Sequence, residues 1–101
     1  MQVFDLKTMT SHPYEQRDKN VFYEAREFKA RIIELSPGGE ISRCEMISYV
    51  IFYVIEGSVE LNVNGEKTMI REGECFITEP VTLSMKTENG VRILGIQIAK
   101  D

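Results

Sequence analysis

Few residues of this chain could carry catalytic or metal chemistry. The sequence of 101 residues contains two cysteines, Cys44 and Cys75, and a single histidine, His12. The two cysteines form no CxxC pair, which excludes a zinc ribbon or a thioredoxin-type site, and a disulfide framework is not expected. A cysteine nucleophile would need a nearby base. We expect His12 to be a turn residue next to Pro13, and both cysteines to be buried free thiols.

The charged residues suggest no acid–base pair. Glu45 alternates toward solvent in the expected register, and Glu56 and Glu79 flank turns, so all three are expected to be solvated. Arg31 and Arg43 are also assigned to outward faces. The chain has 12 basic and 16 acidic residues, a net charge of −4 and no basic run. Nucleic-acid binding, which needs a positive face, is therefore not expected.

Length and composition indicate one domain of an ordinary globular protein. Apolar residues make up 43% of the chain and charged residues 28%. No apolar run approaches the length of a membrane-spanning helix. The first residues contain neither a basic nor an apolar signal region, so the expected location is cytoplasmic, without membrane association.

The elements that must position the candidate residues are β-strands, because the hydrophobic period from Val21 onward is two. Turn chemistry is expected at 36–39, at Gly57-Ser58, at Asn64-Gly65 and at Gly73. The run 50–55 is expected to be buried on both faces. The strands expected between these turns cover 28–32, 42–48, 50–55, 59–63, 67–71, 75–78, 83–86 and 91–99. Many short strands with glycine turns predict an all-β sandwich or barrel.

The spacing of the glycines resembles the first motif of the cupin family. That motif places a glycine, five residues, His-x-His, three or four residues, Glu, six residues and a final glycine. Here the two glycines are Gly38 and Gly57, while Cys44, Met46 and Val50 occupy the histidine and glutamate positions. The resemblance implies a single cupin-type double-stranded β-helix, or jelly-roll barrel, over residues 28–101. Residues 1–27 would form an N-terminal segment that packs on the barrel or on a dimer partner.

The second cupin motif is matched less closely. It begins at Gly73-Glu74 and reaches its proline at Pro80, one residue later than in the family pattern. Counting from Gly73 places the third histidine position on Ser84, whereas counting from Pro80 places it on Met85. The second count also matches the family asparagine, at Asn89, so Met85 is preferred and Ser84 stays open.

The resemblance therefore implies a cupin whose metal ligands are replaced. The four motif positions are Cys44, Met46, Val50 and Met85, and none offers the imidazole or carboxylate that a metal such as Zn or Fe prefers. Tyr53, with Tyr49 as an alternative, could add an oriented hydroxyl. The expected ligand-binding set in the barrel interior is Cys44, Met46, Val50, Tyr53 and Met85.

Three interpretations of this set stay open. The first is a pocket for a small, mostly apolar ligand in a non-catalytic binding or sensing module, with no cofactor. The second is an enzyme with a replaced metal set, in which copper, as Cu(I), is bound by the sulfurs of Cys44, Met46 and Met85, or with another residual activity. The third is an interior filled by its own side chains. The resemblance also implies a homodimer, and the apolar start of the chain is consistent with a covered surface.

Overall fold

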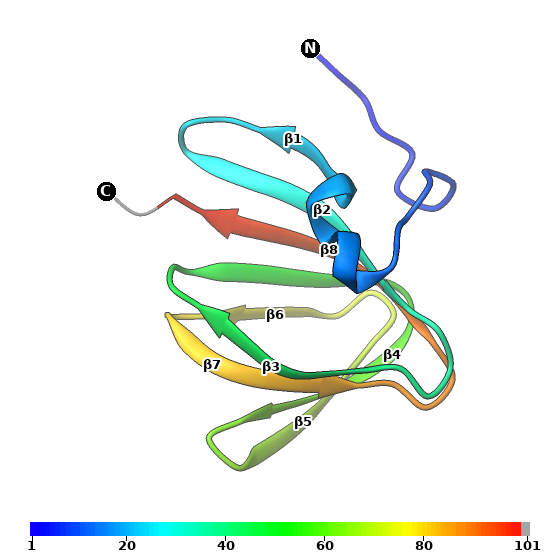
Figure 1. Ribbon diagram of the computed structural model, residues 1–101, viewed down its shortest axis with the longest axis vertical. Helices are drawn as coiled ribbons and strands as arrows, with labels where there is room; N and C mark the ends of the chain where they lie inside the picture. The colour runs from blue at the N-terminus through cyan, green and yellow to red at the C-terminus, as the bar shows by residue number, and fades with distance from the viewer. Residues whose placement is uncertain (100–101) are drawn as a thin grey trace.

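The computed structural model describes residues 1–99 and consists almost entirely of antiparallel β-structure (Figure 1). One short 3-10 helix, η1, covers Tyr14–Asn20. Among the described residues no helix is long and apolar enough to cross a membrane. The strands are β1 (Val21–Glu24), β2 (Phe28–Leu35), β3 (Glu40–Met46), β4 (Val50–Val63), β5 (Glu66–Arg71), β6 (Cys75–Thr78), β7 (Val81–Lys86) and β8 (Val91–Ile98).

The strands form a curled sheet in the order β1-β2-β8-β4-β7-β3, with β5 and β6 also paired to β4. The first part of β4 pairs with β6 and β8, and its second part pairs with β5 and β7. A single strand therefore serves both halves of the barrel. The all-β, cupin-type architecture expected from the sequence is confirmed.

The turn predicted at Gly57-Ser58 is wrong, because the structure has a bend within β4 at this position. The strand continues through both residues, with a register shift between Val54 and Glu56. Gly57 has a φ of +81°, and a Cβ added there would lie 2.2 Å from the carbonyl oxygen of Gly90. Only glycine allows this close backbone approach, so Gly57 makes a corner within one strand rather than a turn between two.

The expected hairpin at Asn64-Gly65 is confirmed. Both residues have positive φ, 54° and 84°, as a type I′ turn requires. The Gly65 amide also donates a hydrogen bond of 2.9 Å to Oδ1 of Asn62. Local turn chemistry thus sets the register of β4 with β5.

The core lies on the concave face of the sheet, where alternate side chains of the strands meet. The run 50–55 buries its two faces unequally: Val50, Phe52 and Val54 point inward and are buried, whereas on the outer face Ile55 is buried but Tyr53 is 40% exposed. The buried apolar cluster consists of Leu35, Ile41, Val50, Phe52, Val54, Val59, Leu61, Ile70, Leu83, Met85, Val91 and Ile93.

Residues 6–11 of the N-terminal segment are attached to β2 and β8 at Glu34 and Arg92. The Arg92 guanidinium, which is buried, donates hydrogen bonds to the carbonyls of Leu6 (2.7 Å) and Met9 and pairs with Glu34 at 3.1 Å. The Ser11 hydroxyl donates to the other oxygen of Glu34 at 2.5 Å. These hydrogen bonds fix the residues that precede η1, so that η1 lies beside the open side of the barrel.

Candidate functional site

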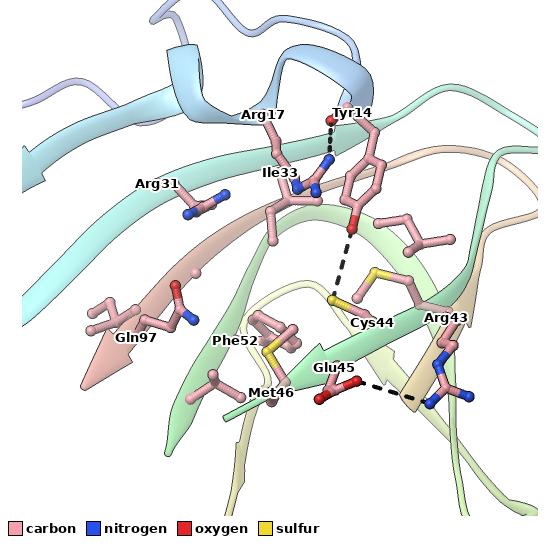
Figure 2. A pocket seen from close by; sticks show the side chains of 15 residues that line it. Tyr14, Arg17, Arg31, Ile33, Arg43, Cys44, Glu45, Met46, Phe52 and Gln97 are labelled. Carbon is pink, nitrogen blue, oxygen red and sulfur yellow. Dashed lines mark hydrogen bonds and ion pairs between the residues drawn. The ribbon is translucent and has the colours of Figure 1, made fainter. Parts of the chain in front are cut away.

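A cavity of about 320 Å³ opens on the concave face, between β2 with η1 on one side and β3 on the other. Its apolar lining comes from three parts of the sheet, including Ile33 of β2, Ile41 of β3 and Phe52 of β4. Polar side chains stand around its mouth (Figure 2). The volume is in the range of small-molecule sites in proteins.

Four of the five expected site residues line this cavity: Cys44, Met46, Val50 and Met85. They meet there because each occupies an inward position of its strand, and β3 pairs with β7 in the register Ile41 to Met85 and Cys44 to Leu83. Ser84, the other candidate for the third histidine position, does not line this cavity and borders a separate hollow. Met85 is thus the residue that shares the cavity with Cys44 and Met46.

The fifth expected residue, Tyr53, lies elsewhere. Its side chain is on the convex face, since it alternates with the inward Phe52 and Val54, and it lines a shallow groove beside Phe4 and Leu6. Tyr49, named as an alternative, is also exposed. Neither tyrosine supplies a hydroxyl to the cavity.

The hydroxyl at the cavity comes instead from Tyr14 of η1, whose O–H lies 4.0 Å from Sγ of Cys44, as a donor to sulfur. Burial raises the pKa of the Cys44 thiol, although the Tyr14 hydrogen bond lowers it in part. Burial, with the neighbouring Cys44, also raises the pKa of Tyr14. Both groups are therefore neutral at pH 7, and the cavity wall at this point is an uncharged O–H···S pair.

Arg17 lies directly over Tyr14. Its guanidinium carbon is 4.5 Å from the centroid of the Tyr14 ring, and its Nη1 donates a hydrogen bond of 3.2 Å to the Tyr14 carbonyl. A cation stacked on an aromatic ring and tied to a backbone oxygen has a defined position. Arg17 is thus fixed at the cavity mouth although it is an exposed residue.

Arg31 corrects the expectation that this side chain faces outward. It lines the cavity with Ile33 and is half-buried. The outward assignment failed because both faces of β2 are partly buried: Ala30 and Ile32, on the face opposite Arg31, are themselves buried. The alternation of Arg31 with Ile33 and Leu35 was the signal that could have placed it inside.

Arg43 and Glu45 also border the cavity and were expected at the surface. Both are largely exposed, with 74% and 66% of their side chains accessible, and they form an ion pair of 3.9 Å. In Figure 2 this pair lies apart from Arg17 and Arg31, at the other end of the cavity. Gln97 of β8, which the sequence interpretation missed, completes the polar mouth.

The donor set does not fit the histidine-bound metal of the cupin motif. Within residues 1–99 no three His, Cys, Asp or Glu side chains are grouped so that they could hold a metal ion. His12 is engaged elsewhere: its amide donates to Oδ1 of Asn20 at 2.7 Å, and its carbonyl accepts from Nδ2 at 2.9 Å. It does not line the cavity of Cys44. A Cys44–His12 catalytic pair is therefore not formed.

The cysteines differ from the expectation of two buried thiols. Both are free, but Cys44 is half-buried whereas Cys75, at the start of β6, is exposed. Position 75 points outward because it lies opposite Tyr53 in the register of β4 and β6.

Comparison with known proteins connects the chain to others through structure alone. No protein-family model matches it, and no curated protein matches it. Solved structures do match, among them a cupin superfamily protein from Desulfitobacterium hafniense with a TM-score of 0.74 at 9% identity, covering 79% of this chain and 74% of that one. A cupin-2 domain protein from Shewanella frigidimarina has a TM-score of 0.68 at 17% identity, covering 78% of each chain.

An enzyme is also among the structural neighbours. Salicylate 1,2-dioxygenase from Pseudoaminobacter salicylatoxidans, solved as an adduct with gentisate, has a TM-score of 0.66 at 22% identity over 70% of this chain and 20% of the dioxygenase. At these identities the similarity establishes the fold and not the activity. The chain has the cupin fold, and the site must be interpreted from its own residues.

Proposed function

We propose that this cupin-fold chain is a cytoplasmic module that binds or senses a small molecule in the barrel cavity, without catalysis. The observation that supports the proposal is the cavity of about 320 Å³ at the replaced ligand positions. Protein interiors are normally close-packed. Here Cys44, Met46 and Met85 leave the space open, and their soft side chains form a wall that adapts to an apolar ligand.

The test uses methionine methyl groups as local reporters. Met46 and Met85 line the cavity, whereas Met69 is exposed on β5 and serves as the internal reference. The protein is labelled with 13C-methyl methionine and titrated separately with octanamide, octanoate and octylammonium. Binding in the cavity predicts saturable shifts of the Met46 and Met85 signals with at least one probe, while the Met69 signal stays unchanged.

Two variants locate the binding. Cys44→Phe places a ring in the cavity and is expected to abolish the shifts. Cys75→Phe places the same ring on an exposed position outside the cavity and is expected to leave them intact. The proposal is overturned if none of the three probes shifts the cavity methionines, or if Cys44→Phe binds as well as the original chain.

A second candidate is a soft-metal site. Cys44, Met46 and Met85 border one cavity, and one thiolate with two thioethers suits Cu(I). The raised pKa of Cys44 weakens this candidate, since the thiol must lose its proton to bind. Loading with Cu(I) under reducing conditions tests it: one copper per chain, lost in Cys44→Ser, would support it, and a sub-stoichiometric content would count against it.

We also propose that the chain forms a homodimer. The supporting observation is the apolar patch on the convex face of β4 and β6, where Tyr53 and Ile77 are 40% and 65% exposed and Tyr49 lies nearby in sequence. Covering such side chains is favourable. Sedimentation velocity at micromolar concentration is expected to give the dimer mass, and Ile77→Lys is expected to give monomer. A monomer mass for the unmodified chain would refute the proposal.

A further inference from the structure

We infer that the cavity takes an organic anion with an apolar body, of the class represented by a medium-chain carboxylate, and that Arg17 and Arg31 hold its charged group. This inference rests on the proposed binding function and specifies its ligand. Within residues 1–99 neither arginine forms an ion pair with a carboxylate, and the cavity that both line has a largely apolar interior.

Arg31 is a charged side chain without a protein partner. It is half-buried and lines the cavity. Across residues 1–99 it takes part in no ion pair and no side-chain hydrogen bond. A guanidinium is always charged, and removing it from water is unfavourable unless an anion or acceptor replaces the water. Opposite Arg31 in the strand register is Gly95, which has no side chain that could pair with the guanidinium; the space over Gly95 is occupied by Ile33 and Phe52.

Arg17 supplies a second cation with unused donors. One of its nitrogens donates to the Tyr14 carbonyl and its plane lies over the Tyr14 ring. A guanidinium has five N–H donors in a planar fork, so most remain available to a ligand. Both arginines influence the interior electrostatically, because each lowers the pKa of Cys44 against the effect of burial. The anchored Arg17 is a preorganised donor, which reduces the entropy lost on binding.

The charge around the cavity is opposite in sign to that of the whole chain. The protein has a net charge of −4, whereas the charged residues that line the cavity are Arg17, Arg31, Arg43 and Glu45. Arg43 and Glu45 pair with each other. Two uncompensated positive charges are left, and both lie on the side formed by η1 and β2 (Figure 2).

The apolar lining of the cavity indicates that the part of the ligand beyond its charged group is apolar. Met46, Phe52 and Met85 line the cavity inward of the arginines. An inorganic anion would leave this apolar surface against water, whereas a carboxylate with an attached chain or ring would cover it. The volume of about 320 Å³ corresponds to about ten water molecules at the density of liquid water. Octanoate, with a carboxylate and a seven-carbon tail, matches that chemistry.

The experiment compares three head groups on one tail. Octanoate, octanamide and octylammonium are titrated into the 13C-methyl methionine protein, and their dissociation constants are taken from the Met46 and Met85 shifts. We expect octanoate to bind at least about ten times more tightly than octanamide, which is the scale of one charge-assisted hydrogen bond. We expect octylammonium to bind more weakly than octanamide.

Variants assign the effect to the two arginines. Arg31→Gln and Arg17→Gln are each expected to lower the affinity for octanoate about tenfold or more and to change that for octanamide less than about twofold. Arg31→Lys, which keeps the charge, is expected to retain part of the preference. Arg26→Gln removes one positive charge from an exposed position in the β1–β2 turn and is the matched control, with no expected effect.

The outcomes separate this inference from the proposed function. If all three probes bind equally well, or if octanamide binds best, the anion preference is refuted while cavity binding stands. If no probe shifts the cavity methionines, the binding function itself fails. A loss of octanamide binding in Arg31→Gln equal to the loss of octanoate binding would show that the variant perturbs the cavity rather than the charge, and would also refute the role given to Arg31.

Discussion

The corner of β4 allows a sharp prediction from the substitution Gly57→Ala. Gly57 has a φ of +81°, and its added Cβ would lie 2.2 Å from the carbonyl oxygen of Gly90 and 3.1 Å from Cα of Val91. Those atoms are backbone and cannot rotate away. The Gly90 amide is itself held by Oγ1 of Thr87 at 2.9 Å. A methyl group at position 57 must therefore force β4 and the Val91 end of β8 apart.

Gly73→Ala is the matched control. Gly73 has nearly the same φ, +83°, but within residues 1–99 a Cβ added there would meet no atom inside 4 Å. An alanine in the left-handed region costs about 1–2 kcal/mol of folding free energy, and this cost is common to both variants. The steric conflict at Gly57 adds about 1–3 kcal/mol, as overpacking does elsewhere. Gly57→Ala should thus lose about 2–5 kcal/mol in total, against about 1–2 kcal/mol for Gly73→Ala.

Urea unfolding followed by far-UV circular dichroism measures both losses, since the chain has no tryptophan to report by fluorescence. The slope m should be equal in the three proteins, so that the midpoints report stability directly. Equal losses for the two variants would refute the reasoning, because they would show that the approach of Gly57 to Gly90 is not a constraint on the folded chain.

Three further predictions concern the N-terminal anchor and the cysteines. The hydrogen bond from Ser11, with a smaller contribution from Arg92, lowers the pKa of Glu34 below its usual 4.5. The contribution of ionised Glu34 to the folding free energy is therefore complete above pH 4.5 and is lost as the pH falls through the lowered pKa. The melting temperature of Glu34→Gln should thus decline less steeply between about pH 5 and pH 3 than that of the unmodified chain. An equal decline in the two proteins would contradict this role of Glu34. Arg92→Leu should release the N-terminal segment, measured as faster proteolysis within residues 1–20, and unchanged protection would contradict the anchor. Iodoacetamide at pH 8 should modify the exposed Cys75 about ten times faster or more than Cys44, because burial raises the Cys44 pKa; faster modification of Cys44, seen by peptide mass analysis, would be the contrary result.

Sequence reasoning succeeded where the determining interactions are local. The Asn64-Gly65 hairpin follows from the φ values that its own two residues prefer. Gly57 was mistaken for a turn residue because a glycine with positive φ has the same sequence signature in a turn and in a bent strand. The distinction depends on Gly90, which is 33 positions further along the chain.

In the candidate site, too, some residues could be predicted from the sequence and others could not. Cys44, Met46 and Met85 were expected together because the resemblance to the cupin motifs assigns them to histidine positions, and all three line the cavity. Tyr14 and Arg17 were missed because only tertiary contacts return η1 to the cavity mouth. The contact that anchors their segment joins Arg92 to Leu6, which no local pattern predicts.

The contact between Arg92 and Leu6 also affects the order in which parts of the protein can fold during synthesis. Arg92 is made 75 residues after Arg17, which takes roughly 4–15 s at typical translation rates. Until β8 is complete, β2 has no partner on that side and the first residues have no guanidinium to bind. The mouth of the cavity is therefore among the last parts of the molecule to assemble. Binding of the proposed ligand would therefore require a chain that has been synthesised at least to the end of β8.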